Sequence, residues 1–168
     1  MTTPAHFQTF ARYNQWANRR LYAACAELAD ADYRAPRRAF FGSIHGTLNH
    51  LLVTDRIWMG RIEGVDSGLR ALDQILFEDF GELRAGREAE DERIIAFADR
   101  LTPADLDRAL AYKTTVGKPQ ETPLAWVLAH LFNHETHHRG QTHGLLSQTE
   151  VAPPSLDLMF YLRTASSG

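Results

Sequence analysis

Residues 124–146 show an apolar stripe at helical spacing, and two histidines stand within that stripe. At 100° per residue, His134 and His138 lie on the same face of a helix. Residues four apart on a helix have Cβ atoms about 5–6 Å apart, so two imidazoles there can bind one divalent ion at about 2.0–2.1 Å per bond. The sequence therefore predicts a helix whose core face carries a metal-binding pair. That face comprises Leu124, Val127, Leu131, His134, His138, Thr142 and Leu145.

The pair alone leaves a second interpretation open, which is a hydrogen-bonded core pair or a run of surface histidines. A buried polar group without a partner costs about 1–3 kcal/mol, so a metal ion or hydrogen bonds must compensate for it. Polar residues also interrupt the apolar stripes of two other segments, with Asn14 and Asn18 in the first and Asp55 in the second. These polar residues in the expected core favour the metal-binding interpretation of the histidine pair.

Three further long segments show helical periodicity, and they span residues 7–28, 43–63 and 72–101. Ser43 is a plausible cap for the second of them. Amphipathic helices of this length bury one face against each other, and the chain shows little strand signal. Together with the histidine-bearing helix, they predict an all-α fold, a four-helix bundle in which sites form from inward side chains on facing helices.

Shorter elements are expected around the fourth long helix. Thr122 and Pro123 form the cap and first-turn proline typical of a helix start, and we expect that helix to end near Ser147. Before it, residues 110–119 are compatible with a small β-hairpin. After the double proline at 153–154, Ser155 is expected to cap a short C-terminal helix.

Size and composition restrict the class of protein. A chain of 168 residues predicts a single domain, residues 1–168, long enough to bury a continuous core. Cys25 is the one cysteine, which excludes an internal disulfide framework and fits a reducing compartment. The formal charge of −3, with acids and bases interspersed, gives no footprint for nucleic acid. Without an apolar run of about 18 residues or a signal peptide, we expect a cytoplasmic protein with no membrane partner.

A third metal ligand has to come from another histidine, because a catalytic zinc-type site has three protein ligands and an open position. Periodicity does not choose it. In the segment 43–63, His50 shares a side with Thr54, Ile57 and Arg61 that flanks the apolar stripe, and His45 lies on the opposite flank. The residues alone leave six candidates, which are His6, His45, His50, His130, His137 and His143.

Motifs in three of the long segments resemble the DinB family. The first segment contains NQWAN at residues 14–18 and the second contains HLLVTDRIW at 50–58. The fourth contains HLFNH at 130–134 and HRGQ at 138–141, and PPSLDL at 153–158 resembles the C-terminal signature of the family. The resemblance spans nearly the whole chain, and the motif around the histidine pair is its most specific part.

The resemblance implies a four-helix bundle with an up-down-down-up path and a divalent ion held by three histidines. Carried over to this sequence, the metal ligands are His50, His134 and His138. The DinB-like superfamily includes enzymes that transfer a low-molecular-weight thiol, such as bacillithiol, mycothiol or glutathione, onto electrophiles. The resemblance therefore implies a small-molecule thiol and an electrophilic substrate as partners. Zinc and nickel are the favoured ions, and iron and manganese also suit three imidazoles.

Two other functions compete with thiol transfer. One is a non-catalytic, metal-binding bundle in a stress response, in which His137 or Glu135 closes the coordination sphere as a fourth protein ligand. The other is a zincin-type hydrolase, because residues 134–138 also match H-E-x-x-H with Glu135 as general base. The metzincin extension fails at Gln141, where a glycine is required. We therefore expect Glu135 to be a structural carboxylate and the zincin to be the weaker alternative.

Several other residues receive structural roles. Asn14 and Asn18 are expected either to donate hydrogen bonds to a ligand histidine or to link helix backbones. Asp55 is expected to pair with a cation such as Arg139, and Arg87 to extend to the surface. Cys25 is expected to be a small core residue and not a nucleophile. Tyr13 and Trp16 lie off the core stripe and are expected to pack against a neighbouring element or a second copy in a homodimer.

Overall fold

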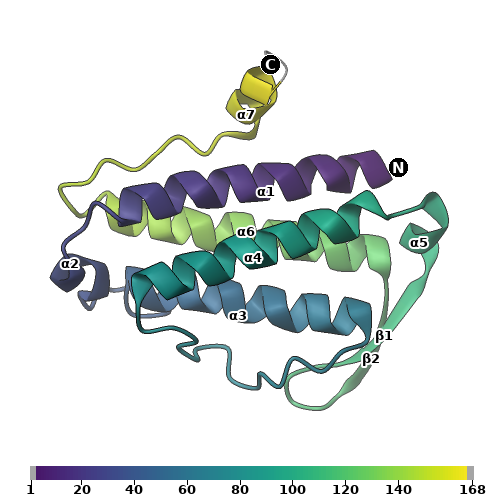
Figure 1. The fold of residues 1–168 in the computed structure, drawn as a ribbon. Helices are drawn as coiled ribbons and strands as arrows, with labels where there is room; N and C mark the ends of the chain where they lie inside the picture. The colour runs from purple at the N-terminus through teal and green to yellow at the C-terminus, as the bar shows by residue number, and fades with distance from the viewer. Residues whose placement is uncertain (1–2, 166–168) are drawn as a thin grey trace.

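Four long helices form the body of the molecule. The computed structural model describes residues 3–165, and in it α1 (Pro4–Cys25), α3 (Ile44–Glu63), α4 (Phe80–Asp99) and α6 (Leu124–Leu146) lie side by side (Figure 1). α1 packs against α4 and α6, and α3 packs against the same two helices. α1 and α6 run one way and α3 and α4 run the other way, which is the up-down-down-up path (Figure 1). The predicted all-α bundle is confirmed.

Side chains satisfy free N–H groups at the starts of three of the four long helices. Thr3 accepts from the backbone of His6 at the start of α1, where Pro4 is the first helical residue. Ser43 does the same for α3 as expected, and Asp79 does so for α4. Such caps contribute about 1 kcal/mol each. They determine where each helix begins, and therefore which residues face the core.

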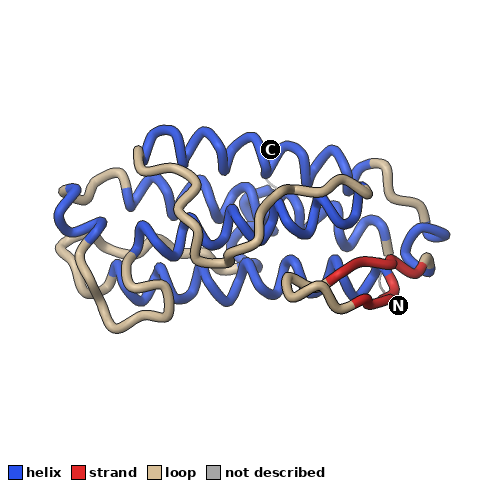
Figure 2. The backbone as a smooth tube through the Cα atoms, turned by 90° about the horizontal axis from the view of Figure 1, so that it is seen from below, coloured by secondary structure: helices blue, strands red, loops and turns tan. Residues whose placement is uncertain are grey.

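The predicted helix 72–101 begins eight residues too early. The backbone N–H groups of Leu76 and Phe77 donate to Oδ1 of Asn49 at 2.8 and 3.1 Å, and the Asn49 amide donates to the Phe77 carbonyl at 3.3 Å. Because these groups bond to a buried side chain of α3, they are not available for helical hydrogen bonds. Residues 64–79 instead form a long loop that crosses one face of the bundle (Figure 2).

The segment between α4 and α6 contains a short helix and the expected hairpin. α5 (Pro103–Asp107) precedes β1 (Ala109–Lys113) and β2 (Pro119–Pro123), which pair antiparallel, Leu110 opposite Thr122. The hairpin lies at one end of the bundle, next to the start of α6 (Figure 2). The predicted helix start at Thr122 and Pro123 is wrong, because both residues belong to β2 and no side chain caps α6.

Two further short helices follow α1 and α6. α2 (Asp30–Arg34), which the sequence did not indicate, follows α1. α7 (Leu158–Ala165) is the expected C-terminal helix, but Asp157 caps it and Ser155 does not, since Oδ1 of Asp157 accepts from the Phe160 backbone at 2.9 Å. Tyr13 and Trp16 both pack against Tyr161 of α7. The element against which Tyr13 and Trp16 pack is therefore α7 of the same chain.

The interior consists of two apolar clusters with a polar layer between them. One cluster gathers around Phe7, Met59 and Leu131, and the other around Leu21, Leu48 and Leu146. Between them lie the fully buried charged and amide side chains of α1, α3, α4 and α6, described below. Among the described residues, no helix combines the length and the apolar character needed to cross a membrane.

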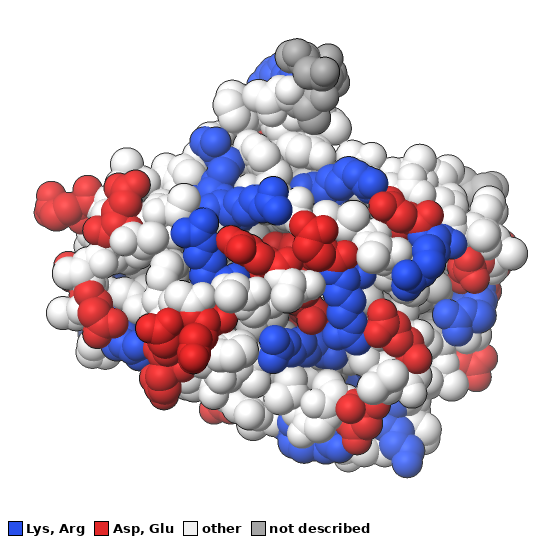
Figure 3. Space-filling model, viewed as in Figure 1, with Lys and Arg blue, Asp and Glu red and all other residues white. Residues whose placement is uncertain are grey.

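Acidic and basic side chains alternate on the face formed by α1 and α4 (Figure 3). Arg12 pairs with Asp99 at 2.9 Å, and Arg93 pairs with Glu63 at 2.6 Å. Exposed pairs of this kind each contribute about 0–1 kcal/mol. The stability of the fold therefore depends on the interior and not on these bridges.

Candidate metal centre

Three histidine rings converge between α3 and α6. One nitrogen from each of His50, His134 and His138 lies within 4.8 Å of the corresponding nitrogens of the other two. Nε2 of His50 is 3.3 Å from Nε2 of His134, and the rings of His134 and His138 are 4.3 Å apart between centroids. The local i, i+4 spacing places two rings one turn apart on α6, and the antiparallel packing of α3 brings the third ring opposite them.

Hydrogen bonds orient two of the rings. Nδ1 of His50 lies 2.8 Å from the carbonyl oxygen of Leu72, in the loop that Asn49 binds at Leu76 and Phe77. A carbonyl can only accept, so Nδ1 carries the proton and Nε2 keeps its lone pair. Nδ1 of His138 likewise donates to Oε1 of Gln141 at 2.8 Å. This outer layer of hydrogen bonds is the arrangement that fixes the tautomer of metal-ligating histidines.

Burial keeps the three rings neutral. It lowers the pKa of His50 to about 4, the pKa of His134 to about 3, and also the pKa of His138. Mutual repulsion between the three imidazoles acts in the same direction as burial at His134. Because an imidazole must be deprotonated to bind a metal, the cluster has the protonation state that a metal requires at neutral pH.

The donor set fits a divalent metal ion. Three neutral imidazole nitrogens face one point, and two of the rings have their second nitrogen occupied by an acceptor. Two converging lone pairs repel each other unless a proton or a cation lies between them. Three histidines at this separation match the ligand number of an open catalytic site.

The cluster lies at the edge of a cavity of about 340 Å³, which His50 and His134 help to line. Phe41 stacks on His50 at 3.7 Å between ring centroids and closes the other side. The cavity wall also includes residues of α3, the hairpin segment, the loop after α3 and α6, among them Trp58, Arg61, Tyr112, Leu72 and His130. A small molecule in this cavity would therefore contact two of the three histidines.

The other histidines lie outside the cluster. His130 contacts the rings of Trp58 and His134 but contributes no ligand atom. His137 is exposed and accepts a hydrogen bond from the amide of Gln141 at 3.1 Å. His45 lies at the N-terminal start of α3, where its ring binds the hydroxyl of Tyr33. Of the six candidates for a third ligand, the structure brings only His50 to the pair within the described residues.

Glu135 points away from the cluster into the polar layer. Its carboxylate binds Arg139 at 2.7 Å and Arg87 at 3.2 Å, and it is completely buried. Burial acts against its ionisation, but the charges of Arg87 and Arg139 outweigh burial and lower its pKa. Glu135 is therefore a structural carboxylate, as expected, and neither Glu135 nor His137 closes the coordination sphere.

The expected pairing of Asp55 with a cation is observed, but the cation is Arg87, at 2.7 Å, and not Arg139. The expectation for Arg87 itself is wrong. Arg87 does not reach the surface, because it is 1% exposed and also binds Asp91 at 3.1 Å. Three carboxylates from three helices converge on this one guanidinium, which explains why it is buried.

Asn14 and Asn18 complete this layer and do not contact the histidines. Both amides donate to Oδ1 of Asp91, at 3.3 and 3.0 Å, and both side-chain oxygens accept from Arg139. Neither of their two expected roles is observed: they link side chains and not helix backbones. Cys25 is buried as expected, and burial raises the pKa of its thiol to about 12.

Sequence reasoning missed the residues that position the site. Asn49 orders the loop that supplies the Leu72 carbonyl, and Gln141 holds both His138 and His137. The spacing of Gln141 carries a signal for this role, because it lies three residues after His138 on the same helix. Asn49 has no such signal, since its partners are 27 and 28 residues away.

Comparison with known proteins agrees with this architecture. A model of the DinB family matches residues 1–167. The Protein DinB of Bacillus subtilis (strain 168) is 27% identical over 158 residues, which cover 89% of this chain and 90% of the relative. A DinB-like protein of Bacillus subtilis has a crystal structure with a TM-score of 0.61 and 18% identity, covering 88% of this chain and 97% of that chain. One from Bacillus cereus ATCC 10987 also has a TM-score of 0.61, with 20% identity, and covers 87% and 94%.

Proposed function

The chain belongs to the DinB family, and from this premise we propose that it binds a divalent metal ion through His50, His134 and His138. We further propose that the bound ion serves a thiol S-transferase that detoxifies electrophiles. The observation that carries the proposal is the convergence of three neutral imidazoles at the edge of a cavity. The thiol-transfer part rests on the family resemblance and on the charge of the site.

The charge of the site favours an anionic sulfur. A divalent ion supplies there an electrophilic centre that lowers the pKa of a thiol or a water that binds it. The nearest carboxylate along α6, that of Glu135, is neutralised by two arginines in the polar layer. The three histidines are themselves neutral, so they add no negative charge to compensate that of the ion.

The reaction is a substitution in which a thiol RSH attacks an electrophile R′–X. The new bond joins sulfur to carbon, the C–X bond breaks, X leaves with its electron pair, and the thiol proton passes to water. The residues of this chain hold the reactants together in a cavity walled by Trp58, Tyr112 and Leu72. Such positioning contributes to the rate by lowering the entropic cost of bringing two molecules together.

The principal alternative is a metal-binding bundle without catalysis. It predicts a fourth protein ligand that closes the site. Among the described residues, only three donors converge, and both residues considered for closure point elsewhere. This observation favours the enzyme over the structural bundle.

The zincin alternative requires Glu135 to act on a water at the metal. In the structure its two carboxylate oxygens bind Arg87 and Arg139, and Glu135 does not line the cavity. A general base must lie within hydrogen-bond reach of the proton it takes. The geometry therefore favours thiol transfer over peptide or ester hydrolysis.

The metal proposal is tested by elemental analysis of untagged protein, followed by single alanine substitutions of the three histidines. We expect each substitution to remove most of the metal, whereas His130→Ala and His137→Ala keep it. Chelation is expected to lower the melting temperature, because a ligand that binds only the folded state stabilises it by mass action. Full metal content in the His50→Ala protein would refute the assignment.

The transferase proposal is tested separately, by screening small thiols against 1-chloro-2,4-dinitrobenzene with zinc-loaded or nickel-loaded protein. We expect at least one thiol to react faster than in buffer, with a rate that depends on all three histidines and not on Cys25. Cobalt-substituted protein reports thiol binding through its absorption spectrum. If no thiol is accelerated and none alters that spectrum, the non-catalytic bundle is the correct function.

A further inference from the structure

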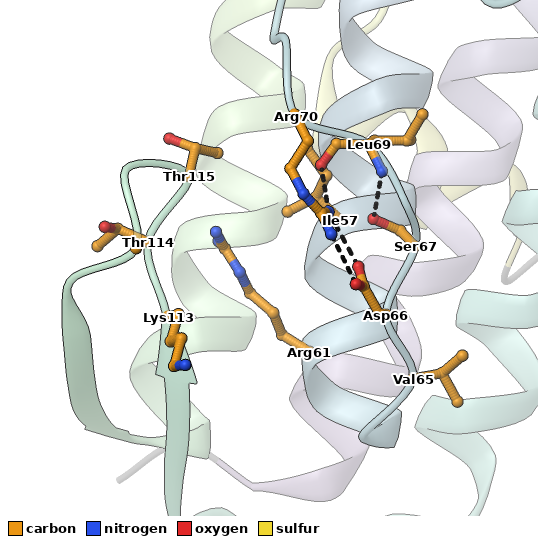
Figure 4. A pocket seen from close by; sticks show the side chains of 11 residues that line it. Ile57, Arg61, Val65, Asp66, Ser67, Leu69, Arg70, Lys113, Thr114 and Thr115 are labelled. Atoms are coloured by element: carbon orange, nitrogen blue, oxygen red, sulfur yellow. Dashed lines mark hydrogen bonds and ion pairs between the residues drawn. The ribbon is translucent and has the colours of Figure 1, made fainter.

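The cavity at the histidine cluster adjoins a second cavity of about 380 Å³. The two share Ile57, Arg61, Thr114 and Thr115 in their walls. Figure 4 shows the second cavity between α3, the loop after it and the turn of the β-hairpin. We call these two adjoining cavities the cleft.

Arg61 stands where the two cavities meet. Its side chain extends from α3 across the cleft towards the hairpin segment that carries Thr114 (Figure 4). The guanidinium lies 4.5 Å from the ring centroid of Trp58 and 5.2 Å from that of Tyr112. Stacking on two aromatic rings fixes the orientation of the planar group.

Arg61 has no anionic partner within the described residues, since no hydrogen bond or ion pair involves its guanidinium. Burial lowers its pKa, which shows the cost of holding the charge there without an acceptor. The neighbouring Arg70 is different, because Asp66 binds it at 2.6 Å (Figure 4). Of these two arginines, only Arg61 has its N–H groups free to bind a ligand.

We propose that Arg61 is a specificity-determining residue that binds an oxyanion, a carboxylate or a phosphate, on a thiol whose sulfur lies at the histidine cluster. This inference rests on the proposed function and names its substrate class. The planar fork of arginine pairs with such groups through two parallel hydrogen bonds. Thr114 and Thr115 line the same cleft, and Oγ1 of Thr114 accepts a hydrogen bond from the backbone of Lys118.

The spacing along α3 limits the length of the substrate. His50 and Arg61 are 11 residues apart, which corresponds to an axial rise of about 16 Å. The arginine side chain leans back towards the helix N-terminus and shortens this span. A thiol with its carboxylate only two carbons from sulfur cannot reach both groups, whereas a longer, flexible or peptide-sized thiol can.

The test measures binding to zinc-loaded protein by calorimetry, without turnover. The probes are ω-mercaptoalkanoates of increasing chain length, each matched with the mercaptoalcohol of equal length. We expect the carboxylate to bind about tenfold or more tightly once the chain spans the cleft, because a charge-assisted hydrogen bond is stronger than a neutral one. The shortest pair should show no difference.

Variants assign the preference to Arg61. Arg61→Gln should bring the ratio of the two dissociation constants close to one at every length, and Arg61→Lys should restore part of it. Arg70→Gln is the matched control in the same cleft and should keep the ratio, since Asp66 already neutralises that cation. Zinc content and circular dichroism verify that each variant is folded. A mercaptoalkyl phosphate of the best length distinguishes the two oxyanions.

The outcomes separate this inference from the proposed function. A carboxylate or phosphate preference that depends on Arg61 supports the inference even if no thiol is transferred. Equal binding of charged and neutral thiols at all lengths overturns it, even in a protein that catalyses transfer. An anion preference that survives in Arg61→Gln overturns it as well.

Discussion

Two faces of α6 place polar side chains in the interior by opposite means. On one face, Glu135 and Arg139 belong to a layer in which every carboxylate meets a cation, an amide or another carboxyl group. On the other face, His134 and His138 lie against His50, and burial keeps all three rings neutral. The charges of one region are paired within the protein, whereas the other region offers neutral nitrogens to the cation that we propose.

The balance of the polar layer explains why it tolerates burial. Burial and the nearby charge of Glu135 raise the pKa of Asp55 well above its ordinary value, whereas at Glu135 the charges of Arg87 and Arg139 outweigh burial and lower the pKa. Nη1 of Arg87 donates to Asp55 and Glu135, whereas its Nε and Nη2 make no hydrogen bond and Nη2 lies 3.1 Å from Asp91. A buried polar network whose charges are paired favours one packing of the helices. The layer therefore holds in place the helices that carry the three histidines.

The largest expected effect comes from removing the central cation of the layer. Arg87→Met leaves Asp55, Asp91 and Glu135 in contact without their common partner. We expect the free energy of unfolding to fall by about 3–5 kcal/mol, as when one member of a buried ion pair is removed. Urea denaturation of the metal-free protein measures this change.

Arg84→Met is the control, since Arg84 lies on the same helix but is half-exposed and pairs only with Glu88. Its effect on stability should be close to the error of the measurement. A similar stability for the two variants would show that the layer is not the structural centre of the bundle.

The two regions should respond to pH with opposite signs. In the metal-free protein the pKa of His134 is about 3, against about 6.5 in an unfolded chain. The unfolded chain binds more protons, so this contribution to stability is present above pH 6.5 and is lost as pH falls. Asp91 has a raised pKa of about 6, so its contribution is present below pH 3.8 and is lost as pH rises through 6.

Differences between wild type and single variants isolate these two contributions. Relative to His134→Leu, the wild type should lose stability as pH falls from 6.5. Relative to Asp91→Asn, it should gain stability as pH falls from about 6 towards 3.8. Urea denaturation at several pH values gives both slopes. Slopes of the same sign would mean that the two regions do not differ in the way described.

A smaller effect is expected from the hydrogen bond behind His138. Gln141→Ala removes the acceptor of the Nδ1 proton and leaves the ligand nitrogen in place. Losing such an outer partner typically weakens metal binding by about 10–100-fold. Competition with a chromophoric chelator measures the affinity, and Gln148→Ala on the exposed end of the same segment is the control. An unchanged affinity would leave Gln141 without a role at the site.

The sequence predicted what depends on local spacing. The pair His134 and His138 and the hairpin follow from periodicities within a few residues, and both are observed. His50 came from the family resemblance, because helical periodicity gives no preference between flanks of one helix. The burial of Arg87 was missed because its partners come from α3, α4 and α6, which only the tertiary structure brings together.

The loop after α3 shows the same limit. Residues 72–79 have a helical pattern, yet the backbone of Leu76 and Phe77 binds Asn49 and the segment forms turns and bends, in which the Leu72 carbonyl reaches His50. Nothing in the order of residues links position 49 to positions 76 and 77. Predictions from sequence therefore fail here at contacts between distant segments, and these contacts are the ones that orient the site.

The smallest expected effect on chemistry is that of Glu135→Gln, although Glu135 directly follows the candidate ligand His134 in the sequence. The amide keeps the shape of the carboxylate, and the loss of its charge removes a neighbour that raises the pKa of Asp55. Asp55 remains as the partner of Arg87 at 2.7 Å. We expect the metal content and the rate of thiol transfer per folded molecule to stay close to those of the wild type.

A zincin predicts the opposite, because removing a general base costs about 10²–10⁴-fold in rate. Steady-state kinetics with thiol and electrophile, and with peptide and ester substrates, distinguishes the two. A loss of that size would place Glu135 at the reacting atoms and remove the distinction between the two faces of α6.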